Sequence, residues 1–346
     1  MTGSRLFLQY AMAFAVPLVA TLWLTPAAAW VAHRFGILDH PGEGRFHSRA
    51  TPYLGGLALA CGLALVGAFT ASASGQLLTI LVGGIALMFV GLADDYRGLG
   101  PAVKLVVEVG AAVGLWLVGV RAGMFGVAAL DCALTILWVV AITNALNLLD
   151  NMDGLAAGVT AIASVTFFAV AARQGDYLVG SFALALAGAS LGFLRHNFPP
   201  ARIFLGDAGS LMLGFLLASL ALKLDLIGQT GFVHLVVPAL ILGVPIFDTL
   251  LVIIARVHES RPIFLGGTDH SSHRLTELGF SSKGVAATTY LAQLCASAVA
   301  FALVYAPRWG VAMAVFVAGL IAAFLLVWFL KIELTPKEEP GLARNP

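Results

Sequence analysis

Long apolar runs separated by short polar segments constrain this chain more than any other feature. A helix needs about 20 mostly apolar residues to cross a bilayer, because its backbone polar groups must be paired inside the segment. Of the 346 residues 60% are hydrophobic and 11% are charged, against about 25% charged in an average soluble domain. The sequence therefore predicts a polytopic membrane protein.

Eleven candidate spans predict an all-α bundle that forms one domain over residues 1–330. The predicted spans are 6–32, 53–71, 76–93, 102–120, 124–146, 154–172, 177–194, 208–227, 232–255, 284–305 and 310–330. The polar composition of residues 331–346 predicts a disordered tail, since it offers little apolar surface to bury.

Basic residues are distributed unevenly over the connections between these spans. All but five of the 19 Lys and Arg residues follow odd-numbered spans; the exceptions are Arg5, Arg121, Arg173, Lys223 and Arg308. The positive-inside rule then predicts an outside N-terminus and a cytoplasmic C-terminus. Residues 1–29 are also similar to a cleaved signal peptide, but cleavage would leave a basic loop outside, so we expect this segment to be retained.

Net charge and cysteine usage exclude two classes of protein. The formal net charge is +1, without the basic stripe of a nucleic-acid-binding protein. The three cysteines are far apart and show no CxxC spacing, so they indicate neither a disulfide framework nor a zinc site.

Two adjacent carboxylates, Asp94 and Asp95, follow the third predicted span, and Lys104 opens the fourth. Neighbouring carboxylates at the end of an apolar helix repel each other and lose hydration, which is costly without a cation. The pair is a candidate for binding a divalent ion or relaying a proton, with a solvated helix end as the alternative. Lys104 is a candidate partner of Asp94 or of an anion.

Four polar residues recur at every third position after the fifth predicted span: Asn144, Asn147, Asp150 and Asp153. On a helix or 3₁₀ turn they share one face, and polar groups in an apolar stretch need partners. They either satisfy one another or bind a polar ligand or hard cation, which prefers oxygen ligands. We favour the ligand.

Glycines surround Asp207, where the eighth predicted span begins. An Asp at this position either caps the helix and meets its dipole, or belongs to a phosphate or Mg²⁺ site of the kind built from glycines at a helix start. The local sequence leaves both interpretations open.

A cluster of histidine, aspartate and arginine follows the ninth predicted span, between Arg256 and Arg274. It indicates anion recognition or acid–base chemistry, although Arg256 and Arg261 also fit as positive-inside anchors. Glu108 and Asp248 lie within predicted spans and are functional candidates by default, with pairing to Arg256 as the simpler role of Asp248.

These segments together resemble the polyprenyl-phosphate N-acetylhexosamine-1-phosphate transferase family over nearly the whole chain. Four family motifs occur in order, at Thr51 to Gly56, at Asp94-Asp95 with the following Lys104, at Asn144 to Gly154 and at Asn197 to Ser210. A third Asp often seen after the Asp-Asp pair is replaced by Gly98. The muramoyl-pentapeptide branch's histidine run followed by Phe-Glu is absent, which favours the N-acetylglucosamine-1-phosphate branch and leaves the exact sugar open.

The resemblance implies attack by a lipid phosphate oxygen on the β-phosphorus of a UDP-sugar, with release of UMP. It implies Mg²⁺, with Mn²⁺ as an alternative, bound by Asp207 with Asp95 nearby, and Asp94 as the group that takes the proton. Lys104 would hold the lipid phosphate. The nucleotide end would be lined by Asn144, Asn147, Asp150, Asp153 and Asn197. The diphosphate and sugar would be held by Arg261, His270, His273 and Arg274.

The implied partners are a UDP-N-acetylhexosamine, polyprenyl phosphate and membrane lipid, with a homodimer as one option and no nucleic acid. The implied location is the inner (plasma) membrane with a cytoplasmic active site that initiates a lipid-linked glycan. A secondary transporter that uses intramembrane acids is the alternative. Transporters often show repeated halves, whereas this chain shows no repeat and its acids gather at one interface.

Overall fold

The computed structural model describes residues 3–39, 50–71, 74–226, 232–263, 267–332 and 334, with only the backbone of residues 65–71. The helices are α1 Gly3–Phe35, α2 Gly55–Ala71, α3 Gly75–Arg97, α4 Pro101–Leu117, α5 Ala128–Leu149, α6 Leu155–Gln174, α7 Tyr177–Asn197, α8 Gly206–Lys223, α9 Val233–Ile241, α10 Gly243–His258, α11 Ser271–Glu277, α12 Ser282–Leu303 and α13 Arg308–Leu330. Most of the predicted tail, and Arg45 and Arg49 of the first basic loop, lie outside the described residues.

The described part of the chain is an all-α membrane protein. Eight of its helices are long and apolar enough to cross a bilayer, and the bent pair α9–α10 adds a ninth candidate. The helices α2 and α4 have 17 residues each and coincide with the two other predicted spans. Eleven crossings therefore remain a prediction. The strands of the described residues are β1 Leu38–Asp39 and β2 Thr51–Pro52, which pair antiparallel with Asp39 opposite Thr51.

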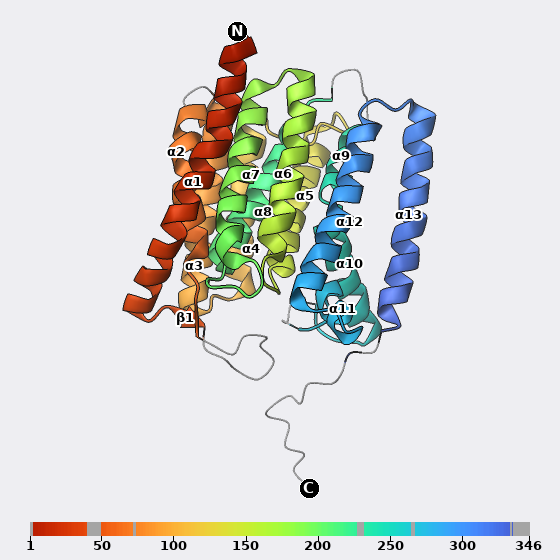
Figure 1. The fold of residues 1–346 in the computed structure, drawn as a ribbon. Coiled ribbons are helices and arrows are strands. Elements are labelled where there is room, and N and C mark those ends of the chain that lie inside the picture. The colour runs from red at the N-terminus through yellow and green to blue at the C-terminus, as the bar shows by residue number, and fades with distance from the viewer. Residues whose placement is uncertain are drawn as a thin grey trace.

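Successive long helices run in alternate directions along the bundle (Figure 1). The start of α1 and the end of α13 lie at opposite ends of the molecule. The ends of α3, α5 and α7 and the starts of α4, α6 and α8 consequently meet at the lower end of the bundle in this view. The polar motifs of the sequence sit on these helix ends, so the topology brings them together.

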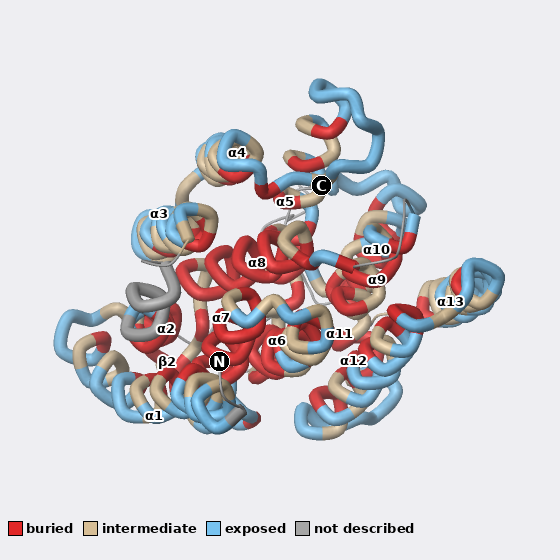
Figure 2. The backbone as a smooth tube through the Cα atoms, turned by 90° about the horizontal axis from the view of Figure 1, so that it is seen from above, coloured by how far each residue is buried: buried red, intermediate tan, exposed pale blue. Residues whose placement is uncertain are grey.

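The core of the bundle is formed by α6, α7 and α8, whereas α1, α3, α4 and α13 lie at the periphery (Figure 2). Small residues allow close packing here, as is usual between membrane helices. A Cβ on Gly188 of α7 would lie 2.2 Å from the Phe14 carbonyl oxygen of α1, and one on Gly192 would lie 2.5 Å from that of Leu18. The N-terminal apolar segment is thus a packed part of the bundle.

The ninth predicted span is not one straight helix, because α9 and α10 meet at an angle of 83°. Pro245, near the start of α10, has no N–H to donate to the carbonyl of Ile241 four residues earlier. The side chain of Gln293 in α12 donates to that oxygen instead, at 2.7 Å. A side chain from a neighbouring helix thus satisfies the backbone where the span breaks, as apolar surroundings require.

Candidate active site

A cavity of about 1350 Å³ opens at the end of the bundle where the polar motifs meet. Eight of the predicted site residues line it: Asp94, Asp95, Asn147, Asp150, Asp153, Asn197, Asp207 and His273. They come from five separate helices or their flanking loops, so the cavity is a product of the tertiary fold.

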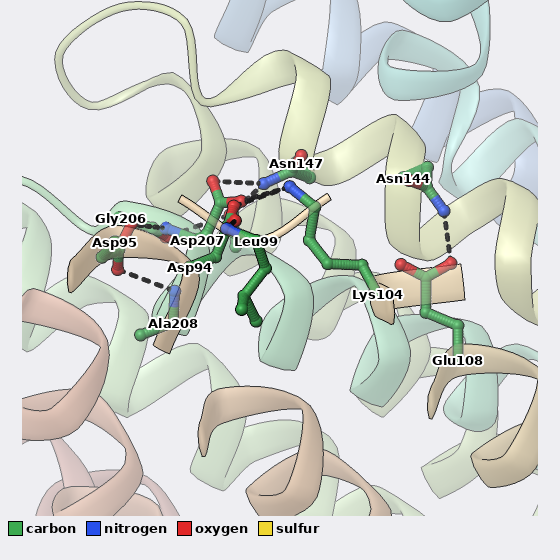
Figure 3. A network of polar contacts seen from close by, with 11 residues as sticks. Asp94, Asp95, Leu99, Lys104, Glu108, Asn144, Asn147, Gly206, Asp207 and Ala208 are labelled. Carbon is green, nitrogen blue, oxygen red and sulfur yellow. Dashed lines mark hydrogen bonds and ion pairs between the residues drawn. The ribbon is translucent and has the colours of Figure 1, made fainter. Parts of the chain in front are cut away.

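Lys104 joins two carboxylates that lie far apart in the sequence (Figure 3). Its Nζ donates to Asp94 Oδ2 at 2.7 Å and to Asp207 Oδ2 at 2.8 Å. Asp94 also accepts from the backbone N–H of Leu99. Pairing with Asp94 is one of the two roles that the sequence left open for Lys104, and the ammonium neutralises part of the charge where α3, α4 and α8 meet.

Asp95 caps α8 from a different helix. Its two carboxylate oxygens accept from the backbone N–H groups of Asp207 at 2.9 Å and of Ala208 at 3.1 Å. The close fit requires glycine at Gly91, where a Cβ would lie 2.3 Å from the Asp207 carbonyl oxygen. Asp207 is therefore not the cap that the local sequence also allowed, and its side chain is free to face Lys104 and the cavity.

The two asparagines of α5 have different surroundings (Figure 3). Asn147 donates to Asp207 Oδ1 and to Ser210 Oγ, both at 2.9 Å. Asn144 lies one turn deeper, donates to Glu108 Oε2 at 2.6 Å and does not line the cavity. Glu108 is buried, and its Oε1 has no hydrogen-bond partner among the described residues.

Asn197 and Asp153 hold the loop between α7 and α8. Asn197 accepts from Gly154 N–H at 3.0 Å and donates to the Ile203 carbonyl at 2.9 Å. Asp153 accepts from the backbone N–H of Ala201 at 2.8 Å. These side chains fix the backbone of one cavity wall, a role that does not require direct contact with a ligand.

Asp150 follows the last residue of α5 and lines the cavity. Burial, together with the negative charges of Asp207 and Asp95, raises its pKa well above the usual range of an aspartate. No described residue donates a hydrogen bond to its side chain. A half-buried acid close to other negative charges is stabilised by a cation or a proton.

The arginines from the end of α10 to α11 form hydrogen bonds and ion pairs with other groups of the protein. Arg256 donates from Nε to Asp269 Oδ2 at 3.0 Å, and Arg261 pairs with the same carboxylate. Burial alone would raise the pKa of Asp269, but these two guanidinium groups hold it below its usual range. Arg274 donates to the carbonyls of Phe329 and Ile332, both at 2.8 Å. Neither Arg261 nor Arg274 lines the cavity.

Asp248 pairs with His270, so the expectation that it pairs with Arg256 is wrong. Its Oδ2 lies 2.7 Å from His270 Nδ1, and its Oδ1 accepts from Ser271 N–H at 2.8 Å and from Ser271 Oγ at 2.6 Å. This carboxylate fastens the start of α11 to α10. His270 is buried away from the cavity, whereas His273, one turn further along α11, lines it.

Three segments of the wall have residues that the predicted site omits. The Thr51–Gly56 motif runs beside the start of α8, with Gly55 N–H donating to Phe204 O at 3.1 Å and Gly56 N–H to Leu205 O at 3.0 Å. Arg202 and Lys283 also line the cavity. Both were counted only as positive-inside charges, and no local pattern distinguishes them from the other basic residues.

An all-helical membrane bundle with a carboxylate-rich cavity at one end defines a class: integral membrane proteins with a polar cavity at one end of the bundle. The family model described as "Glycosyl transferase family 4" matches residues 77–225. The "Probable undecaprenyl-phosphate N-acetylglucosaminyl 1-phosphate transferase" of Bacillus subtilis (strain 168) is 34% identical over 338 residues, which cover 94% of this chain and 91% of that protein.

Two further relatives cover less of the chain. The "Decaprenyl-phosphate N-acetylglucosaminephosphotransferase" of Mycobacterium tuberculosis (strain ATCC 25618 / H37Rv) is 34% identical, over 79% of this chain and 77% of that protein. A "Phospho-N-acetylmuramoyl-pentapeptide-transferase" of Heliobacterium modesticaldum (strain ATCC 51547 / Ice1) is 33% identical, over 62% of this chain and 73% of that protein. The chain belongs to glycosyltransferase family 4.

Proposed function

We propose that this protein transfers N-acetylglucosamine-1-phosphate, or a related N-acetylhexosamine-1-phosphate, from a UDP-sugar to a polyprenyl phosphate at the cytoplasmic face of the inner membrane. The observation that carries the proposal is the meeting of Asp94, Asp95, Asn147 and Asp207 at one cavity, in a chain similar over 94% of its length to a named transferase. Transfer rather than transport is favoured, because the named relatives are transferases and the cavity lies at one end of the bundle.

In the proposed reaction an oxygen of the lipid phosphate attacks the β-phosphorus of the UDP-sugar. A bond forms from this oxygen to the β-phosphorus, the bond from the β-phosphorus to the bridging oxygen breaks, and UMP leaves with that oxygen. Asp94 is the proposed acceptor of the proton of the lipid phosphate, and Lys104, held beside it, reduces the repulsion between the two approaching anions. The polar groups of Asn147, Asp150 and Asp153 are proposed to contact the nucleotide.

The donor set at the cavity suits a hard divalent cation. Asp207 and Asp95 are neighbours, and their carboxylate oxygens retain lone pairs beyond the hydrogen bonds that they accept. Among the described residues no three His, Cys, Asp or Glu side chains form a ready metal cage. Mg²⁺ does not need one, because it usually binds one or two carboxylates together with water and substrate phosphates. When bound, the ion would neutralise phosphate charge.

The test is a transfer assay on the purified protein with polyprenyl phosphate and a panel of UDP-N-acetylhexosamines, read by product mass and UMP release. We expect lipid-diphospho-N-acetylglucosamine and UMP with Mg²⁺, and loss of both with a chelator or in Asp207→Asn. Asp225→Asn is the matched control, because Asp225 is an exposed acid beyond the other end of α8. Uptake of a UDP-sugar into proteoliposomes without UMP formation would overturn the proposal in favour of transport.

A further inference from the structure

The charges that line the cavity are unbalanced. Among the residues that the structure describes, six carboxylates line it, those of Asp39, Asp94, Asp95, Asp150, Asp153 and Asp207. The lysine and arginine residues that line it, within the described part of the chain, are Arg202 and Lys283. An anionic substrate entering this space would meet strong repulsion from most of the wall. Lys104 is already engaged with Asp94 and Asp207, so Arg202 and Lys283 are the lysine and arginine side chains of the described wall that remain to attract it.

Arg202 lies on a stretch of backbone that neighbouring groups hold in place. Its N–H donates to the His196 carbonyl at 2.9 Å, and the residues on either side are bound by Asp153 and Asn197. The guanidinium is exposed and pairs with no acid of the described residues. A planar guanidinium with five donors is suited to bidentate contact with phosphate oxygens.

Lys283 is positioned in a similar way in the first turn of α12. Ser281 caps this helix by accepting from Gly284 N–H at 3.2 Å. The cap fixes the backbone of the first turn, from which the Lys283 side chain extends. The Lys283 side chain is exposed and has no acidic partner within the described ranges. Ser281, Ser282 and Thr268 line the same cavity and add hydroxyl groups to its wall.

The arginines expected to bind the diphosphate have other partners. Arg261 pairs with Asp269 and Glu259, and Arg274 binds two backbone carbonyls near the end of α13. Using Arg261 for a ligand would break a contact that holds the loop after α10, and using Arg274 would break contacts that hold the end of α13. Binding a phosphate through Arg202 or Lys283 would break no ion pair with an acid of the described residues.

We propose that Arg202 and Lys283, rather than Arg261 and Arg274, bind the diphosphate of the nucleotide-sugar donor. This inference rests on the proposed function. The phosphate that they recognise has two sources, the donor and the lipid acceptor. The donor is favoured because most of the residues that line the cavity with Arg202 and Lys283 are polar, which suits a water-soluble sugar nucleotide better than a prenyl chain.

The experiment compares Arg202→Gln and Lys283→Gln with the wild-type protein in transfer kinetics and in calorimetric binding of UDP-N-acetylglucosamine. We expect the donor KM and Kd to rise roughly tenfold or more for each variant, as for loss of a charge-assisted hydrogen bond, with the acceptor KM unchanged. Lys283→Arg should retain most of the affinity. Arg195→Gln is the control, because this exposed arginine lines a neighbouring side pocket and not the cavity.

Unchanged donor KM and Kd in both variants would overturn the inference, as would a rise confined to the acceptor KM. Thermal unfolding of each variant within a few degrees of wild type shows that the protein remains folded. A wild-type protein that binds UDP-N-acetylglucosamine but transfers nothing would refute the proposed function, while the binding comparison would still decide the inference. A wild-type protein that binds none of the UDP-N-acetylhexosamines of the panel overturns the inference directly.

Discussion

At the scale of single residues, the protein supplies its own counter-ion to the acidic wall. The Lys104 ammonium lies within 2.8 Å of carboxylates from both α3 and α8. Without it, Asp94 and Asp207 would repel each other at the end of an apolar bundle. Lys104 therefore stabilises the arrangement of acids on which the proposed chemistry depends.

Replacing Lys104 by methionine keeps the length of the side chain and removes its charge. We expect the transfer rate to fall about 100-fold or more, as when one preorganised electrostatic group is removed from an active site. The measurement is kcat at saturating donor and acceptor. Lys223→Met is the control, since Lys223 donates to Gln76 at the other end of the bundle. Equal activity in the two variants would contradict the role of Lys104.

Asp150 should make stability depend on pH. Its raised pKa means that the folded state binds a proton more tightly than the unfolded state, whose aspartate titrates near pH 3.9. This contribution is fully present below that pH and is lost as pH rises through the folded pKa. Thermal unfolding in detergent without divalent ions should therefore occur at lower temperature as pH rises above about 4. Asp150→Asn should flatten the dependence, and an equal slope in both proteins would refute the assignment.

Local sequence predicted the acidic residues of the site but not all of its basic ones. The motifs at Asp94, Asn147 and Asp207 stand out because polar groups are rare in apolar runs, and all three line the cavity. Local sequence could not show that Arg274 binds the protein itself, because its partners are carbonyls 55 and 58 residues further along the chain. The predicted ligand roles remain to be tested.

At the scale of elements, the break between α9 and α10 depends on a contact with α12. Composition predicted apolar helices at the right residues, because span length and hydropathy are local properties. The bend of 83° was not predicted, because its stability depends on the Gln293 amide that reaches the Ile241 carbonyl. The sequence shows Pro245 near the break, but it does not show that Gln293 supplies the donor that the proline lacks.

Gln293→Leu should destabilise the bundle by about 1–3 kcal/mol, the cost of leaving a buried carbonyl without a donor. The expected result is a lower midpoint of thermal unfolding in detergent, with less protection of α9 from hydrogen exchange. Leu294→Ala is the comparison on the exposed side of the same helix. A midpoint equal to that of Leu294→Ala would show that the amide does not support the break.

The contact of Asp248 with α11 should matter for donor binding. Because this carboxylate fixes the start of α11, Asp248→Asn should displace His273 from the cavity wall and raise the donor KM roughly tenfold. Hydrogen exchange of residues 267–278 should increase in parallel. Glu259→Gln, which alters only the exposed ion pair with Arg261, should leave both quantities unchanged. Faster exchange without a change in KM would argue against the link to the donor.

At the scale of the whole molecule, the arrangement of helix ends predicts sidedness. The cavity, the start of α12 and the end of α13 lie at one end of the bundle. The turn before α5 lies at the opposite end. In a chain with Cys61, Cys132 and Cys295 replaced by alanine, Ser282→Cys should react with an impermeant maleimide only from the cytoplasmic side. Gly123→Cys should react only from outside. The reverse pattern would refute the predicted orientation.

The bond between Asp95 and the start of α8 has a consequence for how a substrate is accommodated. This bond joins α3 to α8, although Asp95 and Asp207 are 112 positions apart in the chain. It lies at the part of the cavity wall where we propose that Mg²⁺ binds. That part of the wall can shift only if α3 and the start of α8 shift together. We therefore expect adjustment to differently shaped sugars to come from parts of the wall that this bond does not join, such as those around Tyr53 and Lys283.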